Sequence, residues 1–314
     1  RIREAADEFA GHFDRSPENS QLVSYDRETG KYQYSKEVSG LKLDRDQLAA
    51  DVLAAVNSGS YTASIPPSLT IIPPERTQPQ AKEQYLVIGT FTTKTTNNKN
   101  RNQNIQLAVD AIDGRILKAG EEFSFNLATG NRTSEKGYQP AGAYKNGVLI
   151  EEPGGGVCQV ASTIYTACLY ADLKVTERAP HMFTVTYVQL GMDATIYWGS
   201  LDYKFVNSTD HPLRIDASVS GGYVHIKLMG TTPKDKSYDH IVLHNEVIAT
   251  RQPKTVIDGT ETEITDAGTG VDENGNTVNL VVDKQGNKYV KGEMVNYAYT
   301  GKTVKAYRDY VDAS

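Results

Sequence analysis

Residues 154–171 read Gly-Gly-Gly-Val-Cys-Gln-Val-Ala-Ser-Thr-Ile-Tyr-Thr-Ala-Cys-Leu-Tyr-Ala, and this stretch decides the fold. From Cys158 to Ala171, apolar side chains fall on nearly every side of a helical projection, which is typical of a helix buried in the centre of a domain. Three glycines precede this helix and allow backbone conformations that other residues rarely adopt. We therefore expect a central buried helix with Cys158 in its first turn.

The segments around this helix predict an antiparallel sheet. A strand is expected at residues 84–91, followed by a helix that ends near Gly114. After the central helix, two strands are expected at Met182–Val188 and Ala194–Val206, joined by a short loop. The predicted fold class is α+β: a central buried helix with an N-terminal cysteine packed on an antiparallel sheet. A small N-terminal α/β segment and a C-terminal β module flank it.

Composition and turn signals divide the chain into four parts. Residues 1–72 contain a hairpin signal and a helix that begins after the N-cap residue Asp44, which predicts a small α/β domain. Residues 73–83 are proline-rich, polar and aperiodic, and are interpreted as a linker. Residues 84–230 contain the cysteine-bearing helix and form the main domain. Residues 231–314 carry strand-like runs separated by turn signals, which predict a small β module.

The charge balance limits the partners. The chain has 314 residues with 33 Lys and Arg against 39 Asp and Glu, a formal net charge of −6. Nucleic acids select basic surfaces, so they are not expected as partners. No phosphate-binding or dinucleotide glycine motif is found, and His240 and His244 have no third ligand nearby, so neither a metal nor a cofactor is predicted.

The compartment is predicted from composition. No apolar run approaches the roughly 18–20 residues of a membrane span. The low cysteine content, the 19 tyrosines and the stretches of Thr, Asn, Lys and Gly are typical of an exported protein of a Gram-positive bacterium. We expect an extracytoplasmic protein, located in the cell wall or anchored to the outer face of the cell membrane. The sequence opens on Arg1 rather than Met, which leaves room for an upstream signal or membrane anchor.

Cys158 is the candidate nucleophile. A thiol at a helix N-terminus lies beside unpaired backbone N–H groups and the positive end of the helix dipole, which lower its pKa. The backbone N–H groups of Gly155, Gly156 and Val157 are candidates for an oxyanion hole. His181, the next histidine along the chain, is the candidate base. The competing interpretation is that Cys158 is a small buried apolar residue, the commonest role of a lone cysteine.

The second cysteine has a different predicted role. Cys168 lies in the middle of the helix among apolar neighbours, so we expect it to fill the core. Ten residues at about 1.5 Å rise place the two cysteines ~15 Å apart, which is too far for a disulfide.

A third residue should orient His181. If Gln189–Met192 is a hairpin loop, the strand register sets His181 opposite Ser200 and brings Asp202 close to it. Asp193 would then lie seven residues along the strand, ~23 Å from His181 at about 3.3 Å per residue. Asp202 is therefore the predicted partner, with Asp193 as the alternative if the segment is not a simple hairpin. A turn or strand-end hydrogen bond is the competing role for either aspartate.

A series of short motifs runs in order through the main domain: Phe123–Asn126, Gly130–Thr133, Glu135–Tyr138, Gly154–Gln159, Ser162-Thr163, Glu177-Arg178, His181, Tyr187-Val188, Gly191–Thr195 and Asp202–Phe205. With these motifs the domain resembles the VanW family, which is named for its occurrence in vancomycin-resistance clusters. The resemblance covers roughly residues 84–230, and it departs at Met182 and Gln189, where the family usually has Ser and Pro. Residues 20–72 resemble, more loosely, the peptidoglycan-binding segment that often precedes such domains.

The resemblance implies a cysteine acyltransferase of the L,D-transpeptidase type that acts on peptidoglycan stem peptides. Cys158 would attack the carbonyl before the terminal D-Ala of a donor tetrapeptide. The resulting thioester would then pass its acyl group to the amine of a neighbouring acceptor stem, with His181 acting as base and then acid. A peptidoglycan endo- or carboxypeptidase would share the thioester. A non-catalytic wall-binding protein is the third function considered.

Two arginines of the matching motifs are candidates for substrate binding. Arg132 and Arg178 have the fork of donors that binds a carboxylate in two places, so they are candidates for holding stem carboxylates. Structural ion pairs with Glu135 and Glu177, respectively, are their competing role.

Overall fold

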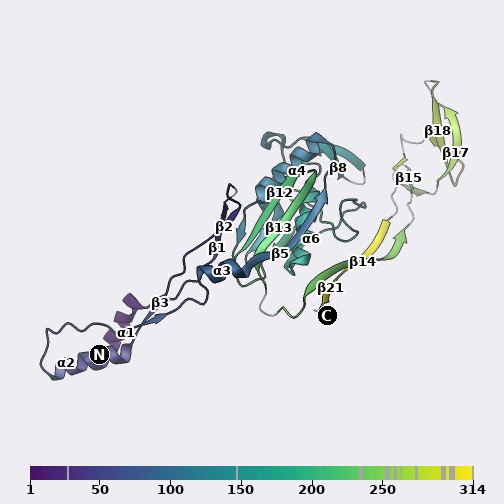
Figure 1. Ribbon diagram of the computed structural model, residues 1–314. Helices are drawn as coiled ribbons and strands as arrows, with labels where there is room; N and C mark the ends of the chain where they lie inside the picture. The colour runs from purple at the N-terminus through teal and green to yellow at the C-terminus, as the bar shows by residue number, and fades with distance from the viewer. Residues whose placement is uncertain are drawn as a thin grey trace.

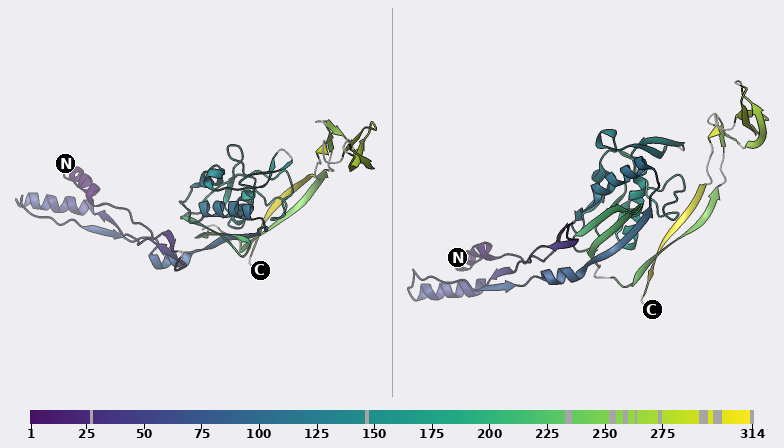
Figure 2. Two further views of the ribbon diagram at one scale, coloured as in Figure 1. Left: turned by 90° about the horizontal axis from the view of Figure 1, so that it is seen from above. Right: turned by 45° about the horizontal axis from the view of Figure 1, so that its top comes forward.

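The computed structural model has the expected α+β fold, with helices and antiparallel sheets that follow one another along the chain. The molecule is elongated, and a central domain separates a helical N-terminal arm from a C-terminal β-ribbon (Figures 1 and 2). The structure describes residues 1–26, 28–145, 148–232, 236–251, 255–257, 260–262, 264–272, 275–290, 295–296 and 301–312.

The predicted central helix is confirmed as α6 (Val157–Tyr170), which is buried over most of its length. It packs beside α4 (Lys99–Ile112) on one face of a four-stranded antiparallel sheet. Alternate residues of β13, Val224, Ile226 and Leu228, are buried against the helices, as one-sided coverage of a sheet requires. The sheet order is β5 (Tyr85–Lys94), β13 (Tyr223–Thr231), β12 (Leu213–Ser220) and β6 (Ile116–Leu117).

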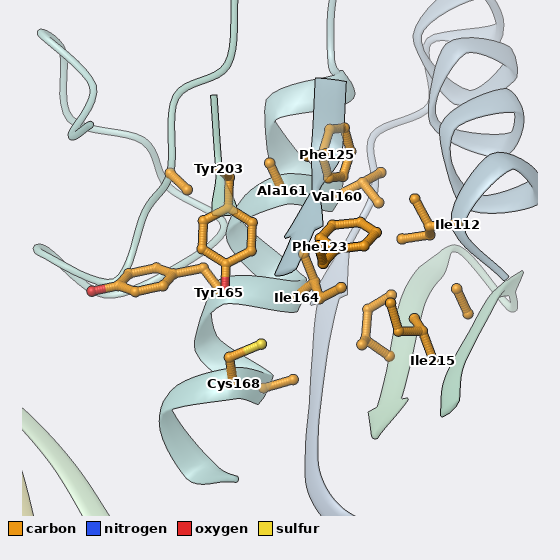
Figure 3. Packing of buried hydrophobic residues seen from close by; sticks show 14 of the residues in the cluster. Ile112, Phe123, Phe125, Val160, Ala161, Ile164, Tyr165, Cys168, Tyr203 and Ile215 are labelled. Carbon is orange, nitrogen blue, oxygen red and sulfur yellow. The ribbon is translucent and has the colours of Figure 1, made fainter. Parts of the chain in front are cut away.

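A second, three-stranded sheet closes the core on the other side of α6. Its aromatic residues Phe123, Phe205 and Tyr203 lie against the helix, with Phe123 and Tyr203 drawn in Figure 3. The strands are β10 (Lys174–Glu177), β11 (Lys204–Val206) and β7 (Glu122–Ser124), in that order. Between β7 and α6 lie α5 (Phe125–Thr129), the short η1 (Ser134–Lys136) and the hairpin of β8 (Pro140–Lys145) and β9 (Val148–Pro153).

The strands predicted at Met182–Val188 and Ala194–Val206 are largely wrong. Residues 181–203 form a loop with only isolated bridges, and of the residues predicted as these two strands only Lys204–Val206 lie in a strand. The reason is a tight turn around Gly199, which has φ +83° and lies within the Tyr197–Leu201 bridge. This turn interrupts the run of strand-forming residues, so the long hairpin and its register do not exist.

The N-terminal arm is built of small, separate elements. The hairpin signal is confirmed by β1 (Leu22–Asp26) and β2 (Lys31–Tyr34). Asp44 caps its helix as predicted, since its side chain accepts a hydrogen bond from the backbone N–H of Gln47 at 2.9 Å. The remaining elements are α1 (Ile2–Phe13), α2 (Arg45–Asn57), β3 (Gly40–Leu43) and β4 (Leu69–Ile72).

The segment expected as a linker, residues 73–83, contains most of a helix, α3 (Gln78–Gln84). Thr77 and Gln80 form a capping box at its start, and a proline occupies its first turn. Among the described residues, no helix is both long and apolar enough to cross a membrane.

The C-terminal part is composed of strands, as predicted. The expected turn at Gln285–Asn287 joins β18 (Thr277–Asp283) to β19 (Lys288–Val290). The other expected turn, Asn274-Gly275, begins at a residue outside the described part of the chain. The remaining strands are β14 (His240–Arg251), β15 (Thr255–Ile257), β16 (Thr260–Thr262), β17 (Ile264–Val271), β20 (Val295–Asn296) and β21 (Gly301–Val311).

Strands β14 and β21 pair into a long antiparallel ribbon that contacts the central domain at two places. At the end of α6, the carboxylate of Asp172 accepts hydrogen bonds from the hydroxyls of Tyr238 at 2.9 Å and Tyr310 at 2.8 Å. At the loop after His181, Gly191 lies so close to β21 that a Cβ on it would be 3.0 Å from the Cβ of Ala306.

Candidate active site

Cys158 occupies the first turn of α6, where the sequence placed it. The helix is capped at its start by Gly156, whose φ of +99° lies in the left-handed region that favours glycine. Cys158 is half-buried and forms no disulfide. Its Sγ lies 3.5 Å from the carbonyl oxygen of Ile196. The thiol therefore faces the loop that follows His181 rather than open solvent.

His181 is held by Asp193, not by Asp202. The ring Nδ1 donates to the Oδ2 of Asp193 at 2.7 Å, and the backbone N–H of His181 donates to the same oxygen at 2.6 Å. Because Nδ1 faces the carboxylate, Nε2 is the ring nitrogen left to interact with the thiol of Cys158. The pKa values of Cys158 and His181 each depend on the other side chain, and Asp193 holds the imidazole from its opposite nitrogen.

The electrostatics of these three side chains favour a thiolate–imidazolium pair. Burial opposes the charged thiolate, but the hydrogen bond and positive charge of His181 outweigh burial, so the pKa of Cys158 is lowered. Burial also opposes a charged imidazole, yet the hydrogen bonds with Asp193 and Cys158 raise the pKa of His181 to about 9. Near neutral pH, His181 is therefore protonated beside a thiol that ionises readily.

The prediction that Asp202 orients His181 is wrong. Its Oδ2 accepts the Ser124 hydroxyl at 2.5 Å, and its Oδ1 accepts the backbone N–H groups of Asn126 at 2.9 Å and Tyr203 at 2.8 Å. Asp202 thus ties the start of α5 to the chain before β11. The prediction failed because it assumed a hairpin register that the turn at Gly199 prevents.

Arg178 binds Asp193, the carboxylate of the candidate Cys158–His181–Asp193 triad. Its Nε donates to the carbonyl oxygen of Asp193 at 2.6 Å, and its Nη2 lies 3.0 Å from Oδ1 of the same residue. The guanidinium carbon also lies 5.3 Å from the ring centroid of Tyr165. Through Nε and Nη2, Arg178 therefore holds Asp193 in place, and its predicted role in substrate binding stays a prediction. The ion pair considered with Glu177 is not formed, because Glu177 pairs with Lys204 at 2.7 Å.

Two of the three predicted oxyanion donors are already engaged. The N–H of Gly155 donates to the carbonyl oxygen of Glu152 at 3.2 Å, and that of Val157 to the carbonyl oxygen of Gly154 at 3.1 Å. The N–H groups of Gly156 and of Cys158 itself have no acceptor among the described residues. Of the predicted set, Gly156 alone keeps an N–H that can bind a substrate oxygen.

The charge of Arg132, a candidate binding residue, interacts with that of the Cys158 thiol. Its Nη1 donates to Oδ1 of Asn126 at 2.6 Å and to the carbonyl oxygen of Gly130 at 3.0 Å. Burial lowers its pKa, and the negative charge of Cys158 acts against that shift. Within the described residues it has no ion pair with Glu135, so the competing structural role is not found.

Sequence reasoning missed Arg101, Gln159 and Tyr187. The Nη2 of Arg101 donates to the side chain of Gln159, the residue after Cys158, at 2.8 Å. The ring of Tyr187 lies edge-on to His181, with centroids 6.4 Å apart. Tyr187 and Gln159 fall within motifs of the family resemblance, which was the available signal. Nothing in the spacing of the sequence connects Arg101 with Cys158.

The comparisons with known proteins agree with this central domain. A family model described as VanW like protein matches residues 100–229. This part of the chain belongs to the VanW family. The VanW match includes Cys158, His181 and Asp193, together with Arg101 and Arg132. Within the described part of the chain, no cluster of His, Cys, Asp and Glu is placed to hold a metal ion.

Two curated relatives are similar to this chain. The uncharacterized protein YoaR of Bacillus subtilis (strain 168) is 38% identical over 163 residues, 52% of this chain and 54% of YoaR. The Vancomycin B-type resistance protein VanW of Enterococcus faecalis (strain ATCC 700802 / V583) is 30% identical over 117 residues, 36% of this chain and 42% of that protein. The chain spans about half the length of the curated relatives it matches. No solved structure matches it.

Proposed function

We propose that this VanW-family protein is a cysteine-dependent L,D-transpeptidase that forms peptidoglycan cross-links through a thioester. The observation that carries the proposal is the arrangement of Cys158 at the start of α6 with a histidine that Asp193 holds through Nδ1 and that lowers the pKa of the thiol. It contains a nucleophile, its base and the residue that orients the base, which is the arrangement of acyl-transfer enzymes that use a covalent intermediate.

In the first half-reaction, the Cys158 thiolate attacks the carbonyl carbon before the terminal D-Ala of a donor tetrapeptide. The developing oxyanion accepts hydrogen bonds from the unengaged N–H groups of Gly156 and Cys158. His181 then gives its Nε2 proton to the departing amine, the C–N bond breaks, and D-Ala leaves. The stem remains bound to Sγ as a thioester.

In the second half-reaction, the side-chain amine of an acceptor stem attacks the thioester carbonyl. His181, now neutral, takes a proton from the attacking amine, and Asp193 stabilises the imidazolium that forms. The C–S bond breaks, and the cross-linked peptide leaves with a new amide bond. The Cys158 thiolate and protonated His181 are restored, so no cofactor is consumed.

The substrate class in this proposal is supported by family membership rather than by geometry. One relative is named a vancomycin resistance protein, and the sequence motifs are similar to those of wall-associated proteins. We accordingly propose an extracytoplasmic location at the cell wall, with donor and acceptor stem peptides as partners and residues 1–72 as a peptidoglycan-binding segment.

The proposal is tested with purified tetrapeptide muropeptides and intact-mass analysis of the protein. We expect a thioester adduct on the wild-type protein and on the Cys168→Ala control, and none on Cys158→Ala. Cross-linked dimers among the products would support transpeptidation. Shortened monomers alone would assign the same site to a peptidase. Unchanged muropeptides with no adduct would contradict catalysis and favour a wall-binding protein.

A further inference from the structure

Two arginines lie on the glycine turn that leads into Cys158, one on each side. A Cβ at Gly154 would lie 2.7 Å from the Cβ of Arg132, and a Cβ at Gly156 would lie 2.5 Å from the Cγ of Arg101. Real Cβ atoms do not approach other carbons so closely. The glycines therefore leave the space that both arginine stems occupy.

Arg101 is placed by a buried scaffold rather than by a flexible surface contact. Its Nη2 binds the side-chain oxygen of Gln159, which is 1% exposed. The amide nitrogen of Gln159 donates in turn to Oγ1 of Thr93 at 2.8 Å and to the carbonyl oxygen of Lys94 at 2.9 Å. Because β5 holds Gln159 in this way, the guanidinium of Arg101 is fixed before any ligand binds.

The second terminal nitrogen of Arg101 is left without a partner. Its Nη1 is buried and finds no acceptor among the described residues. A buried donor that lacks an acceptor destabilises the folded state, so such groups usually have a function. Both arginine stems pack against glycines within four residues of Cys158, and the charges of both guanidinium groups interact with that of the thiol.

A carboxylate is the group that fits two such guanidinium groups, because it accepts hydrogen bonds from both and balances their charge. In a peptide with a free C-terminus, the terminal carboxylate carbon is three bonds from the carbonyl carbon of the last amide. A cationic pair next to the thiol can therefore reach this carboxylate while Cys158 attacks that carbonyl. An internal amide or an amidated end presents only a neutral oxygen at the same position.

We propose that Arg101, together with Arg132, binds the free α-carboxylate of the leaving residue and thereby restricts the site to the last amide of a stem peptide. This assignment rests on the proposed function, and it adds Arg101 as a specificity residue. Arg132 supplies the second cation: its Nη1 is held by Asn126 and Gly130, and its Nη2, which has no acceptor among the described residues, is the donor for the carboxylate.

The test compares a tetrapeptide donor with the same peptide ending in a carboxamide, using the full chain. The kcat/KM for release of the terminal residue should favour the free acid about 10–100-fold in the wild type, the range expected for a charge-assisted hydrogen bond. Arg101→Met should lose most of this preference, because its kcat/KM should fall for the free-acid peptide and stay unchanged for the carboxamide. Arg101→Lys, which keeps the charge without the fork, should retain part of it. The matched control is Lys99→Met, an exposed cation two residues away on α4.

Two results would overturn the assignment: equal use of acid and amide by the wild type, or an equal loss of both substrates in Arg101→Met and Arg101→Lys. Equilibrium binding of the acid and amide peptides to the Cys158→Ala chain separates this assignment from the proposed function. A preference for the acid that depends on Arg101 supports the carboxylate site even if wild-type protein turns over neither peptide. Equal binding of acid and amide contradicts it.

Discussion

The two cysteines of α6 share one helix and have opposite chemistry. Burial raises the pKa of Cys168 to about 12, although its hydrogen bond with Tyr203 acts in the opposite direction, whereas His181 lowers the pKa of Cys158 despite burial. Figure 3 shows Cys168 in the packed cluster with Tyr165 and Tyr203. The comparison teaches that neither residue type nor helix membership decides the pKa of a thiol. A partner from a loop distant in sequence, here His181, lowers it where burial alone would raise it.

The largest expected difference between the two thiols is in their rates of alkylation. With iodoacetamide at pH 7, we expect the folded protein to be labelled at Cys158 at least about 1,000-fold faster than at Cys168, since the latter is fully buried and un-ionised. Peptide mass mapping at successive times measures both rates. Protein unfolded in denaturant is the control, in which the two rates should become similar. Early labelling of Cys168 in folded protein would contradict the comparison.

The pH dependence of that labelling has a defined sign. The labelling rate of Cys158 should rise with pH through a midpoint below the ordinary thiol pKa of 9.0, and His181→Ala should move the midpoint upward. The pKa of His181 is raised from 6.5 to about 9, so its protonated form stabilises the fold fully below about pH 6.5 and loses this effect as pH rises through about 9. The exposed His240→Ala should change neither property.

Substitutions of Asp193 and Asp202 test which aspartate supports His181, the residue that lowers the pKa of Cys158. Asp193→Asn should reduce turnover of a stem-peptide donor about 100-fold, because His181 loses the carboxylate that orients and charges it. Asp202→Asn should leave turnover of the folded protein within about threefold but lower its stability by about 1–2 kcal/mol, since Asp202 accepts two backbone N–H groups. Steady-state kinetics and thermal unfolding of both variants measure these effects. Equal loss of turnover in the two variants would refute the distinction.

The smallest expected effect concerns Cys168 alone. Cys168→Ala removes one buried sulfur from the core and should destabilise the protein by about 1 kcal/mol through the cavity that remains. The labelling rate of Cys158 should stay unchanged. Urea unfolding together with the alkylation assay checks both statements, and a changed Cys158 rate would mean that the two ends of α6 are coupled.

Local sequence patterns predicted the parts of the site that depend on neighbouring residues. The apolar stretch from Cys158 to Ala171 specified α6, and the glycines before it placed Cys158 in the first turn. His181 followed because it is the next histidine along the chain. The short helix α3 also had a local signal, the Thr77–Gln80 capping box, which the proline-rich composition concealed.

The site residues that were predicted wrongly or missed depend on tertiary structure. Choosing Asp202 over Asp193 required the register of a hairpin, and a single turn at Gly199 removes that hairpin. Arg101 meets Gln159 across 58 residues of chain through a scaffold built by β5. Such contacts form only after strands and helices have packed, so no short-range pattern encodes them.

The β14–β21 ribbon has a consequence for where this protein can be cut or extended. It meets the central domain at Asp172, the far end of α6, and at Gly191, in the loop that carries Asp193. A fragment that stops where the family match ends, at residue 229, loses both contacts, so work on the isolated VanW segment calls for boundaries that retain β21. Strands β15–β20 are inserted between β14 and β21 and lie at the distal end of the ribbon (Figure 2). That end is an insertion point at which a module can be exchanged without rebuilding the surroundings of Cys158 and His181.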